Sequence, residues 1–221
     1  MSAILFGSIS TVADTSELQR WAFNQAFAAH GLDWHWDQGR YRTMLSVSGG
    51  QARIQQFARD LDQTVDAEAI HKTKSEIFQA ELASADLTPR DGVVATITGA
   101  RATGWKVGLV TTTSRENILA MLGSLSPDIQ VADFDVIVDA SHVTRPKPDK
   151  AAYVFALHSL QEAAVDCVAI EDNIDGVQAA EAAGVTCVAF PNTNTAPGGV
   201  AAECQVERLD VSELQRIALG A

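Results

Sequence analysis

The chain has 221 residues, of which 47% are hydrophobic and 20% are charged. These proportions exclude a disordered or fibrous protein and fit one large domain, or a main domain with a smaller insert. Acidic residues outnumber basic residues by 28 to 16, so the formal net charge is −12. Because this charge repels phosphate backbones and anionic lipids, we expect neither nucleic-acid nor membrane binding. A small phosphorylated ligand remains compatible with it, since a few basic groups in one pocket override the net field locally.

The N-terminal residues show no basic leader before a long apolar run, and no apolar stretch has the length of a bilayer span, so we expect no signal peptide and no spanning segment. The three cysteines, Cys167, Cys187 and Cys204, do not form a C-x-x-C pair. We expect buried thiols in a reducing compartment, and therefore a cytoplasmic protein. The sequence leaves the oligomeric state open.

Short apolar runs bounded by turn residues alternate with helical patterns along most of the chain. Such runs are typical of buried strands in a parallel sheet, and their alternation with helices predicts an α/β doubly wound fold. Helices are expected within Ser114–Leu122, Lys150–Gln161 and Asp175–Ala183. The expected strands are Ala3–Phe6, Lys106–Thr111, Asp135–Val138, Asp166–Ile170 and Val185–Phe190.

The segment after the first strand breaks this alternation. From residue 14 to residue 87 the apolar residues follow helical spacing, and no strand is predicted. Amphipathic stretches near Gln51–Leu61 and Ala67–Leu82 support this interpretation. We therefore expect an all-helical cap, residues 14–87, inserted into a core domain made of residues 1–13 and 88–221. Ligands of open α/β sheets bind at the carboxyl ends of the strands, so the site is expected after Phe6, Val110, Val138 and Ile170.

Three segments at those strand ends carry a family resemblance. They are Cys167–Gly184 with its acidic pair, Thr111–Ser114, and Lys147-Pro-Asp-Lys-Ala-Ala-Tyr153. Together they resemble the fourth, second and third motifs of the haloacid dehalogenase-like (HAD) hydrolase superfamily, whose phosphatases use Mg²⁺. The resemblance implies a doubly wound core, with Asp172 and Glu171 at the metal. It also implies that Lys147, Thr111 and Thr112 bind phosphate.

The helical insert is similar to the cap of the β-phosphoglucomutase-like subfamily. Tyr41-Arg42, Ser48-Gly-Gly50 and Arg53 resemble the CbbY-like branch, which hydrolyses pentulose bisphosphates, and His71 and Lys74 also fit that branch. The resemblance implies a second, distal phosphate held in the cap. The residues implied are Arg42, Arg53, His71 and Lys74, with an ordinary charged cap surface as the alternative.

The first motif departs from the family pattern F-D-x-D-G-T-L-x-D-[ST]. This chain has Phe6-Gly-Ser-Ile-Ser-Thr-Val-Ala-Asp-Thr15 in that place. Gly7 stands at the position of the nucleophilic aspartate, Ile9 at that of the general acid/base aspartate, and Ser10 at that of the glycine. Asp14 keeps its place, and with Glu17 it fits a helix cap.

These replacements remove chemistry that the family mechanism needs. Gly7 has no nucleophile and Ile9 carries no proton, although its backbone carbonyl is still available as a metal ligand. With one side-chain carboxylate left beside carbonyls and water, Mg²⁺ binding is expected to be weak or absent. A salt bridge from Lys147 to Asp172 or Glu171 would then neutralise the pocket.

Three functions remain open from the sequence. The first is a pseudo-phosphatase that keeps phosphate or sugar-phosphate binding without hydrolysis. The second is a working hydrolase that uses an unusual nucleophile, such as the hydroxyl of Ser8 or Ser10, or an activated water. The third is an interaction protein without a small ligand.

Overall fold

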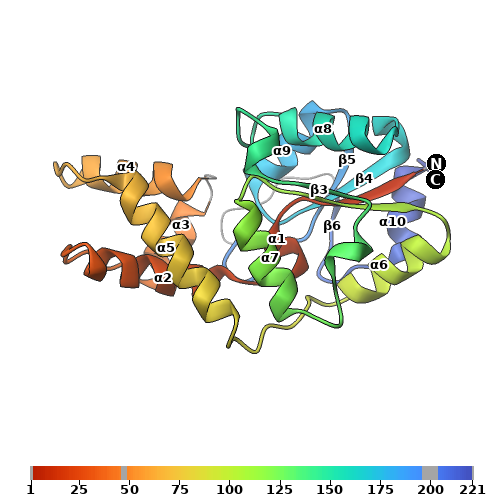
Figure 1. The fold of residues 1–221 in the computed structure, drawn as a ribbon. Coiled ribbons are helices and arrows are strands. Elements are labelled where there is room, and N and C mark those ends of the chain that lie inside the picture. The colour runs from red at the N-terminus through yellow and green to blue at the C-terminus, as the bar shows by residue number, and fades with distance from the viewer. Residues whose placement is uncertain (1, 46–48, 196–203, 221) are drawn as a thin grey trace.

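The computed structural model describes residues 2–45, 49–195 and 204–220, and its centre is a parallel sheet (Figure 1). Within these residues the strand order is β3-β2-β1-β4-β5-β6, and every neighbouring pair is parallel. This order places β1 between β2 and β4, so the residues that follow these three strands meet at one edge. The strands are β1 (Ala3–Phe6), β2 (Lys106–Val110), β3 (Val136–Val138), β4 (Cys167–Glu171), β5 (Thr186–Ala189) and β6 (Cys204–Gln205).

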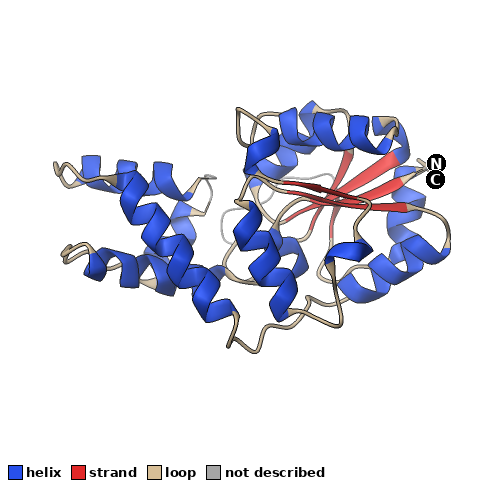
Figure 2. Ribbon diagram, viewed as in Figure 1, coloured by secondary structure: helices blue, strands red, loops and turns tan. Residues whose placement is uncertain are grey.

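Both faces of the sheet are covered by helices, as the doubly wound prediction requires (Figure 2). Alternate residues of β1 face opposite sides: Ile4 and Phe6 pack with helices α6, α7 and α10, whereas Ala3 and Leu5 pack with α8 and α9. The covering helices are α6 (Val93–Ala102), α7 (Arg115–Ser124), α8 (Ala151–Leu160), α9 (Ile174–Ala182) and α10 (Val211–Ala218). The predicted α/β class is therefore confirmed.

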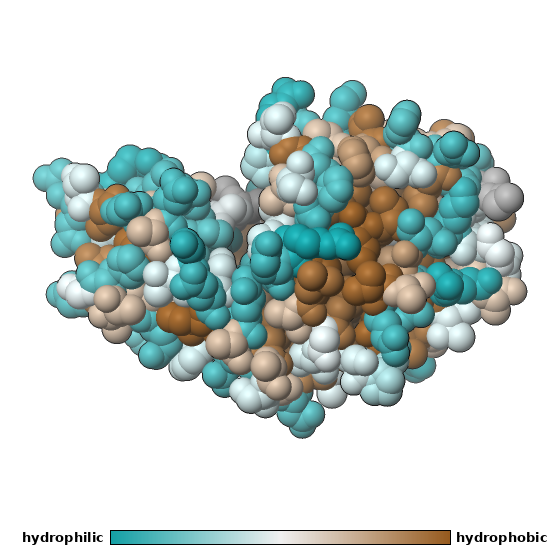
Figure 3. All heavy atoms as spheres, in the orientation of Figure 1, coloured by the Kyte–Doolittle hydropathy of each residue, from teal (hydrophilic) through white to brown (hydrophobic). Residues whose placement is uncertain are grey.

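Helices α2 (Ser16–Ala29), α3 (Gln38–Met44), α4 (Gly50–Asp60) and α5 (Ala67–Leu82), here called the cap helices, form a separate lobe (Figure 1). Aromatic side chains fill its interior, with Trp36 packed between Phe23 and Phe57. Apolar side chains therefore lie inside this lobe, and hydrophilic residues predominate on the face of it seen in Figure 3, whereas a larger apolar area is visible on the core lobe. The boundaries 14–87 remain a prediction, as does the contribution of Ser48, which lies outside the described residues.

The start of α2 differs from the expectation. The helix begins at Ser16 after Thr15, and Asp14 Oδ1 accepts the backbone N–H of Ser16 at 3.0 Å in a turn that precedes the helix. Glu17 pairs with Arg20 at 2.9 Å and does not reach back to Asp14.

A short helix, α1 (Ile9–Val12), occupies the first motif, with Ser8 as its N-cap. No helix in the described part of the chain is long and apolar enough to cross a membrane.

Candidate active site

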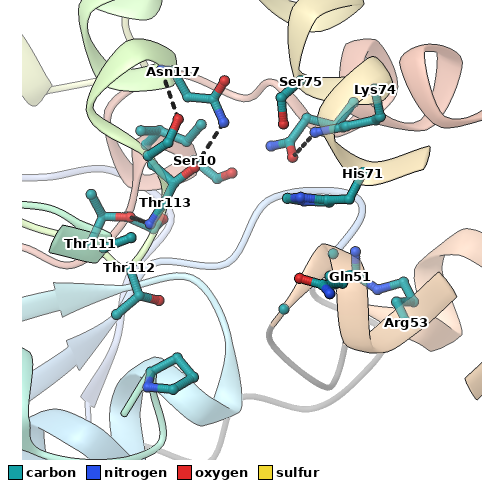
Figure 4. A pocket seen from close by; sticks show the side chains of 18 of the residues that line it. Ser10, Gln51, Arg53, His71, Lys74, Ser75, Thr111, Thr112, Thr113 and Asn117 are labelled. Atoms are coloured by element: carbon teal, nitrogen blue, oxygen red, sulfur yellow. Dashed lines mark hydrogen bonds between the residues drawn. The ribbon is translucent and has the colours of Figure 1, made fainter. Parts of the chain in front are cut away.

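A cavity of about 960 Å³ lies between the cap helices and the carboxyl ends of β1, β2 and β4. The core contributes Gly7, Thr111, Lys147 and Asp172 to its lining, as the topology predicted. The cap helices contribute Arg53, His71 and Lys74 (Figure 4). The structure therefore brings both sets of predicted residues to one cavity, Ile9 included, except for Glu171 and Arg42, which are considered separately below.

Gly7 and Glu171 lie against each other at the floor of this site. A Cβ atom built on Gly7 would be 2.1 Å from Cδ of Glu171, and one built on Gly176 would be 2.2 Å from the same atom. The Glu171 side chain is fully buried and lies between the two glycine backbones. Its carboxylate therefore occupies the space in which a side chain at position 7 would begin.

Lys147 links Gly7, Val110 and Glu171. Its ammonium group donates to the carbonyl oxygen of Gly7, to that of Val110 at 2.8 Å and to Glu171 Oε1 at 2.5 Å. The ammonium of Lys147 thus has three acceptors within the protein. The salt bridge expected for Lys147 forms with Glu171. The side chain of Lys147 is 5% exposed and that of Glu171 is 0% exposed.

Tyr153 completes this buried network, because its hydroxyl donates to Glu171 Oε1 at 2.7 Å and its ring lies 4.8 Å from Lys147 Nζ. Burial raises the pKa of Glu171, and the attraction of Lys147 opposes that rise only in part. Burial beside Glu171 raises the pKa of Tyr153 well above its ordinary value, so this hydroxyl keeps its proton. Glu171 Oε2 has no hydrogen-bond partner among the described residues.

Asp172 lies at the cavity wall, where its Oδ1 accepts hydrogen bonds from Ser8 Oγ at 2.8 Å and from Asn173 Nδ2 at 3.0 Å. Burial raises the pKa of Asp172, while these hydrogen bonds and the charge of Arg90 act in the opposite direction. The Ser8 hydroxyl also accepts the N–H of Thr11 at 3.1 Å. The Ser8 side chain therefore connects the first motif to the fourth.

The metal implied by the resemblance, Mg²⁺, would need oxygen donors at this site. Mg²⁺ prefers several oxygen ligands in octahedral geometry. Within the described ranges, no group of three or more His, Cys, Asp or Glu side chains is placed to hold a metal ion. Glu171 is bound by Lys147 and Tyr153, and the carbonyl of Ile9 accepts the N–H of Ala13 at 3.0 Å inside α1. The residues present do not fit a Mg²⁺ site.

The loop after β2 presents hydroxyl groups at the start of α7. Thr111 is 5% exposed, and its Oγ1 accepts the N–H of Thr113 at 3.2 Å. Asn117 Nδ2 donates to Thr113 Oγ1 at 3.0 Å, and Gln79 Nε2 of helix α5 donates to Asn117 Oδ1 at 2.9 Å. A chain of hydrogen bonds therefore joins this loop to the cap helices.

On the cap side, burial and the neighbouring cations Lys74 and Arg53 lower the pKa of His71 to about 4. Burial, and then the charge of Arg53, lower the pKa of Lys74 to about 7. Arg42 lies apart from the other three residues predicted for the cap: its Nε donates to Asn194 Oδ1 at 3.2 Å, a contact between the cap helices and the loop after β5.

Like Gln79 and Asn117, two further residues that the sequence did not single out take part in the site. Arg90 donates to the carbonyl oxygens of Ser10, Phe190 and Pro191 at 2.8 to 3.1 Å, and its guanidinium lies 3.5 Å from the ring centroid of Phe190. Gln19 accepts from Lys74 at 3.0 Å. Both contacts join residues that are more than fifty positions apart in the chain, so no local sequence signal marks them.

Comparison with known proteins gives the family. The family model for haloacid dehalogenase-like hydrolases matches residues 7–190. Protein CbbY of Cereibacter sphaeroides is 36% identical over 198 residues, 88% of this chain and 86% of that protein. The plasmid-encoded CbbY of Cupriavidus necator is 35% identical over 207 residues, 89% of this chain and 80% of that protein.

Solved structures agree with the sequence relatives. A mutant of CbbY from Rhodobacter sphaeroides in complex with xylulose 1,5-bisphosphate has a TM-score of 0.86 at 35% identity, over 93% of each chain. The complex of CbbY from the same organism with phosphate has a TM-score of 0.88 at 34% identity, over 99% of each chain. The chain therefore belongs to the haloacid dehalogenase-like hydrolases and, within them, to the CbbY-like branch.

Proposed function

We propose that this chain binds a phosphorylated sugar between its core and its cap helices and does not hydrolyse it through a phosphoenzyme. The observation that carries this proposal is the arrangement of Gly7 and Glu171. The residue at the nucleophile position has no side chain, and a buried carboxylate from β4 fills the adjacent space. Glu171 cannot attack a phosphoryl group from there, because its side chain is fully buried against Gly7 and is not among the residues that line the cavity.

Several features support binding of a phosphate ester. The hydroxyls of Thr111 and Thr112 line the cavity at the start of α7, where backbone N–H groups and the helix dipole favour an anion. Arg53 adds positive charge from the cap side. The related CbbY structures contain xylulose 1,5-bisphosphate and phosphate, so a pentulose phosphate is the ligand class we propose.

Weak or absent Mg²⁺ binding is part of the same proposal. It is supported by the engagement of Glu171 with Lys147 and of Asp172 with Ser8 and Asn173. A cytoplasmic location is also proposed, and the three free thiols, Cys167, Cys187 and Cys204, fit a reducing compartment.

The proposal is tested by measuring binding and turnover on the same sample. Isothermal titration calorimetry with xylulose 1,5-bisphosphate should show binding, while an assay of inorganic phosphate with added Mg²⁺ should show no release above the protein-free control. If saturating xylulose 1,5-bisphosphate gives no heat of binding, the result would instead favour the third function, an interaction protein that binds no small ligand.

One observation favours a second candidate, a hydrolase that uses Ser8 as its nucleophile. The Ser8 hydroxyl donates to Asp172 Oδ1 at 2.8 Å, which is the geometry of a nucleophile beside a general base. This candidate predicts phosphate release that is lost in both Ser8→Ala and Asp172→Asn. Release that persists in either variant would exclude it.

A further inference from the structure

Lys74 of helix α5 lies in an environment unlike that of a surface lysine. Its side chain is 3% exposed, and Nζ lies 4.9 Å from the ring centroid of Phe23 and 4.6 Å from that of Phe78. The amine donates one hydrogen bond, to the uncharged amide oxygen of Gln19 at 3.0 Å. Within the part of the chain that the structure describes, no carboxylate forms an ion pair with Lys74.

This environment disfavours the ammonium form. Burial removes the water that stabilises the charge, and Arg53 adds repulsion from a second cation, so the pKa of Lys74 falls to about 7. A lysine that is desolvated and close to another cation is activated as a nucleophile, since its neutral amine is present near neutral pH. Lys147, by contrast, forms an ion pair with Glu171 at 2.5 Å.

The surroundings of Lys74 supply what an addition to a carbonyl group needs. His71 lies three residues earlier on the same helix face and lines the same cavity. Because burial lowers the pKa of His71 to about 4, its imidazole is neutral at physiological pH and able to accept a proton. Figure 4 shows Lys74 and His71 on one side of the cavity and Thr111 and Thr112 on the other.

We propose that Lys74 forms a reversible imine with the carbonyl group of an open-chain phosphorylated ketose or aldose. This inference rests on the proposed function, because it requires the sugar phosphate to enter this cavity. The hydroxyl loop at Thr111 and Thr112 would take the phosphate, and Lys74 the carbonyl carbon. A neutral amine attracts a phosphate only weakly, so this arrangement gives Lys74 a role different from that of a distal phosphate ligand.

The chemistry balances without an oxidant or reductant. The lone pair of Nζ adds to the carbonyl carbon, the carbonyl oxygen takes up a proton, and the nitrogen loses one, which gives a carbinolamine. The nitrogen then loses its second proton, the hydroxyl takes up a proton and leaves as water with cleavage of the C–O bond, and the nitrogen lone pair forms the C=N bond. His71 is placed to accept the proton from nitrogen and to return it to the leaving hydroxyl. A pentulose phosphorylated on carbons 1 and 5 suits this step, because it has no free 5-hydroxyl with which to close a furanose ring.

The test is reductive trapping on the full chain. The protein is incubated with xylulose 1,5-bisphosphate, reduced with sodium borohydride, digested, and mapped by mass spectrometry. We expect an adduct at Lys74, with a yield that rises as the pH passes upward through about 7. Lys74→Arg should abolish the adduct. Lys72→Arg is the matched control and should retain it, since Lys72 lines the same cavity from an exposed position.

Calorimetry on the same sample separates the two proposals. Binding without an adduct would overturn the imine and leave the proposed function standing, whereas neither binding nor an adduct would overturn both. An adduct distributed over Lys72 and other lysines to the same extent as over Lys74 would also overturn the assignment. The position of the adduct in the unaltered protein is informative even if Lys74→Arg does not fold.

Discussion

The carboxylate of Glu171 lies where the side chain of residue 7 would begin, so β4 supplies at this point the negative charge that the first motif lacks. A Cβ at position 7 would approach the Glu171 carboxylate to between 2.1 and 2.5 Å. Glu171 cannot retreat freely, because Lys147, Tyr153 and the backbone of Gly176 surround it. Gly7 and Glu171 therefore depend on each other in packing: the lack of a side chain at position 7 leaves the space that the carboxylate of Glu171 fills.

This relationship predicts that even the smallest side chain at position 7 destabilises the protein. Gly7→Ala should cost about 1–3 kcal/mol in the free energy of unfolding, the usual range for overpacking a filled core. Gly123→Ala is the control: nothing lies within 4 Å of a Cβ there, and alanine in a helix should stabilise by about 0.5–1 kcal/mol. Urea denaturation of both variants measures the difference, and equal stability would contradict the packing of Glu171 against Gly7.

The same packing determines how a first-motif carboxylate could be restored. Gly7→Asp should lower the melting temperature more than Gly7→Ala, because it adds a second buried carboxylate beside Glu171. Adding Glu171→Ala should recover much of that loss, since the new carboxylate then gains both the space and Lys147. A double-mutant cycle measures this coupling, and additive effects would show that the two side chains do not compete.

Lys147 should be far more important for stability than an exposed cation of the same loop. Lys147→Met leaves Glu171 charged and unpaired in the interior, which typically costs about 3–5 kcal/mol. Arg145→Met removes the pair with Asp149, in which the arginine side chain is 75% exposed, and should cost less than about 1 kcal/mol. The burial that raises the pKa of Glu171 also predicts that the defect of Lys147→Met shrinks as acid protonates that carboxylate. A defect that stays the same from neutral to acidic pH would contradict the buried pair.

Lys74 should make stability depend on pH above neutrality. Its pKa is about 7 in the folded protein, whereas an ordinary lysine, as in the unfolded chain, has a pKa of 10.5. Between pH 7 and pH 10.5 the unfolded chain therefore binds a proton that the folded chain does not. Stability therefore gains from Lys74 as pH rises through this window, by up to about 1.4 kcal/mol per pH unit. Lys74→Met should remove this slope and stabilise the protein below pH 7, while Lys72→Met should leave the slope in place. If the free energy of unfolding depends on pH in the same way in Lys74→Met and Lys72→Met, then Lys74 titrates normally.

The hydrogen-bond chain from Gln79 through Asn117 to Thr113 should couple the cap helices to ligand binding. Asn117 is 5% exposed and its partners Gln79 and Thr113 are half-buried, so Asn117→Ala breaks two hydrogen bonds at a cost of about 1–3 kcal/mol. Gln56→Ala, which removes an exposed bond to Asp60, is the control and should change stability little. We expect the affinity for xylulose 1,5-bisphosphate to fall in Asn117→Ala and to stay unchanged in Gln56→Ala. Unchanged affinity in Asn117→Ala would show that the loop after β2 holds its position without the cap.

Much of the core was predictable because its signals are local. Buried strands such as β1 and β4 are continuous apolar runs, and the motif residues that follow them converge because all strands are parallel. Helices α1, α6 and α10 and strand β6 were not predicted, and α3 was predicted only as part of the all-helical insert. In α3 (Gln38–Met44) only Tyr41 is buried, and β6 (Cys204–Gln205) is too short for a periodic pattern.

The site was less predictable where its contacts are distant in sequence. The sequence showed that Gly7 lacks a nucleophile, but not that Glu171 fills the space, because that depends on how β4 and α9 pack against the loop after β1. The burial of Lys74 between Phe23 and Phe78 was equally hidden, since two cap helices must pack before the three side chains meet. The expected helix cap at Asp14 was wrong, because Thr15 holds the N-cap position of α2 and Asp14 accepts the N–H of Ser16 in the turn before it.

We propose that the chain holds a sugar phosphate without cleaving its phosphate ester. Phosphorus NMR of xylulose 1,5-bisphosphate incubated with the purified protein and Mg²⁺ tests this most directly. We expect both ester signals to persist with full integrated intensity, broadened by binding, and no inorganic phosphate signal to appear. Growth of an inorganic phosphate signal that follows the protein through purification and disappears in Asp172→Ala would contradict it.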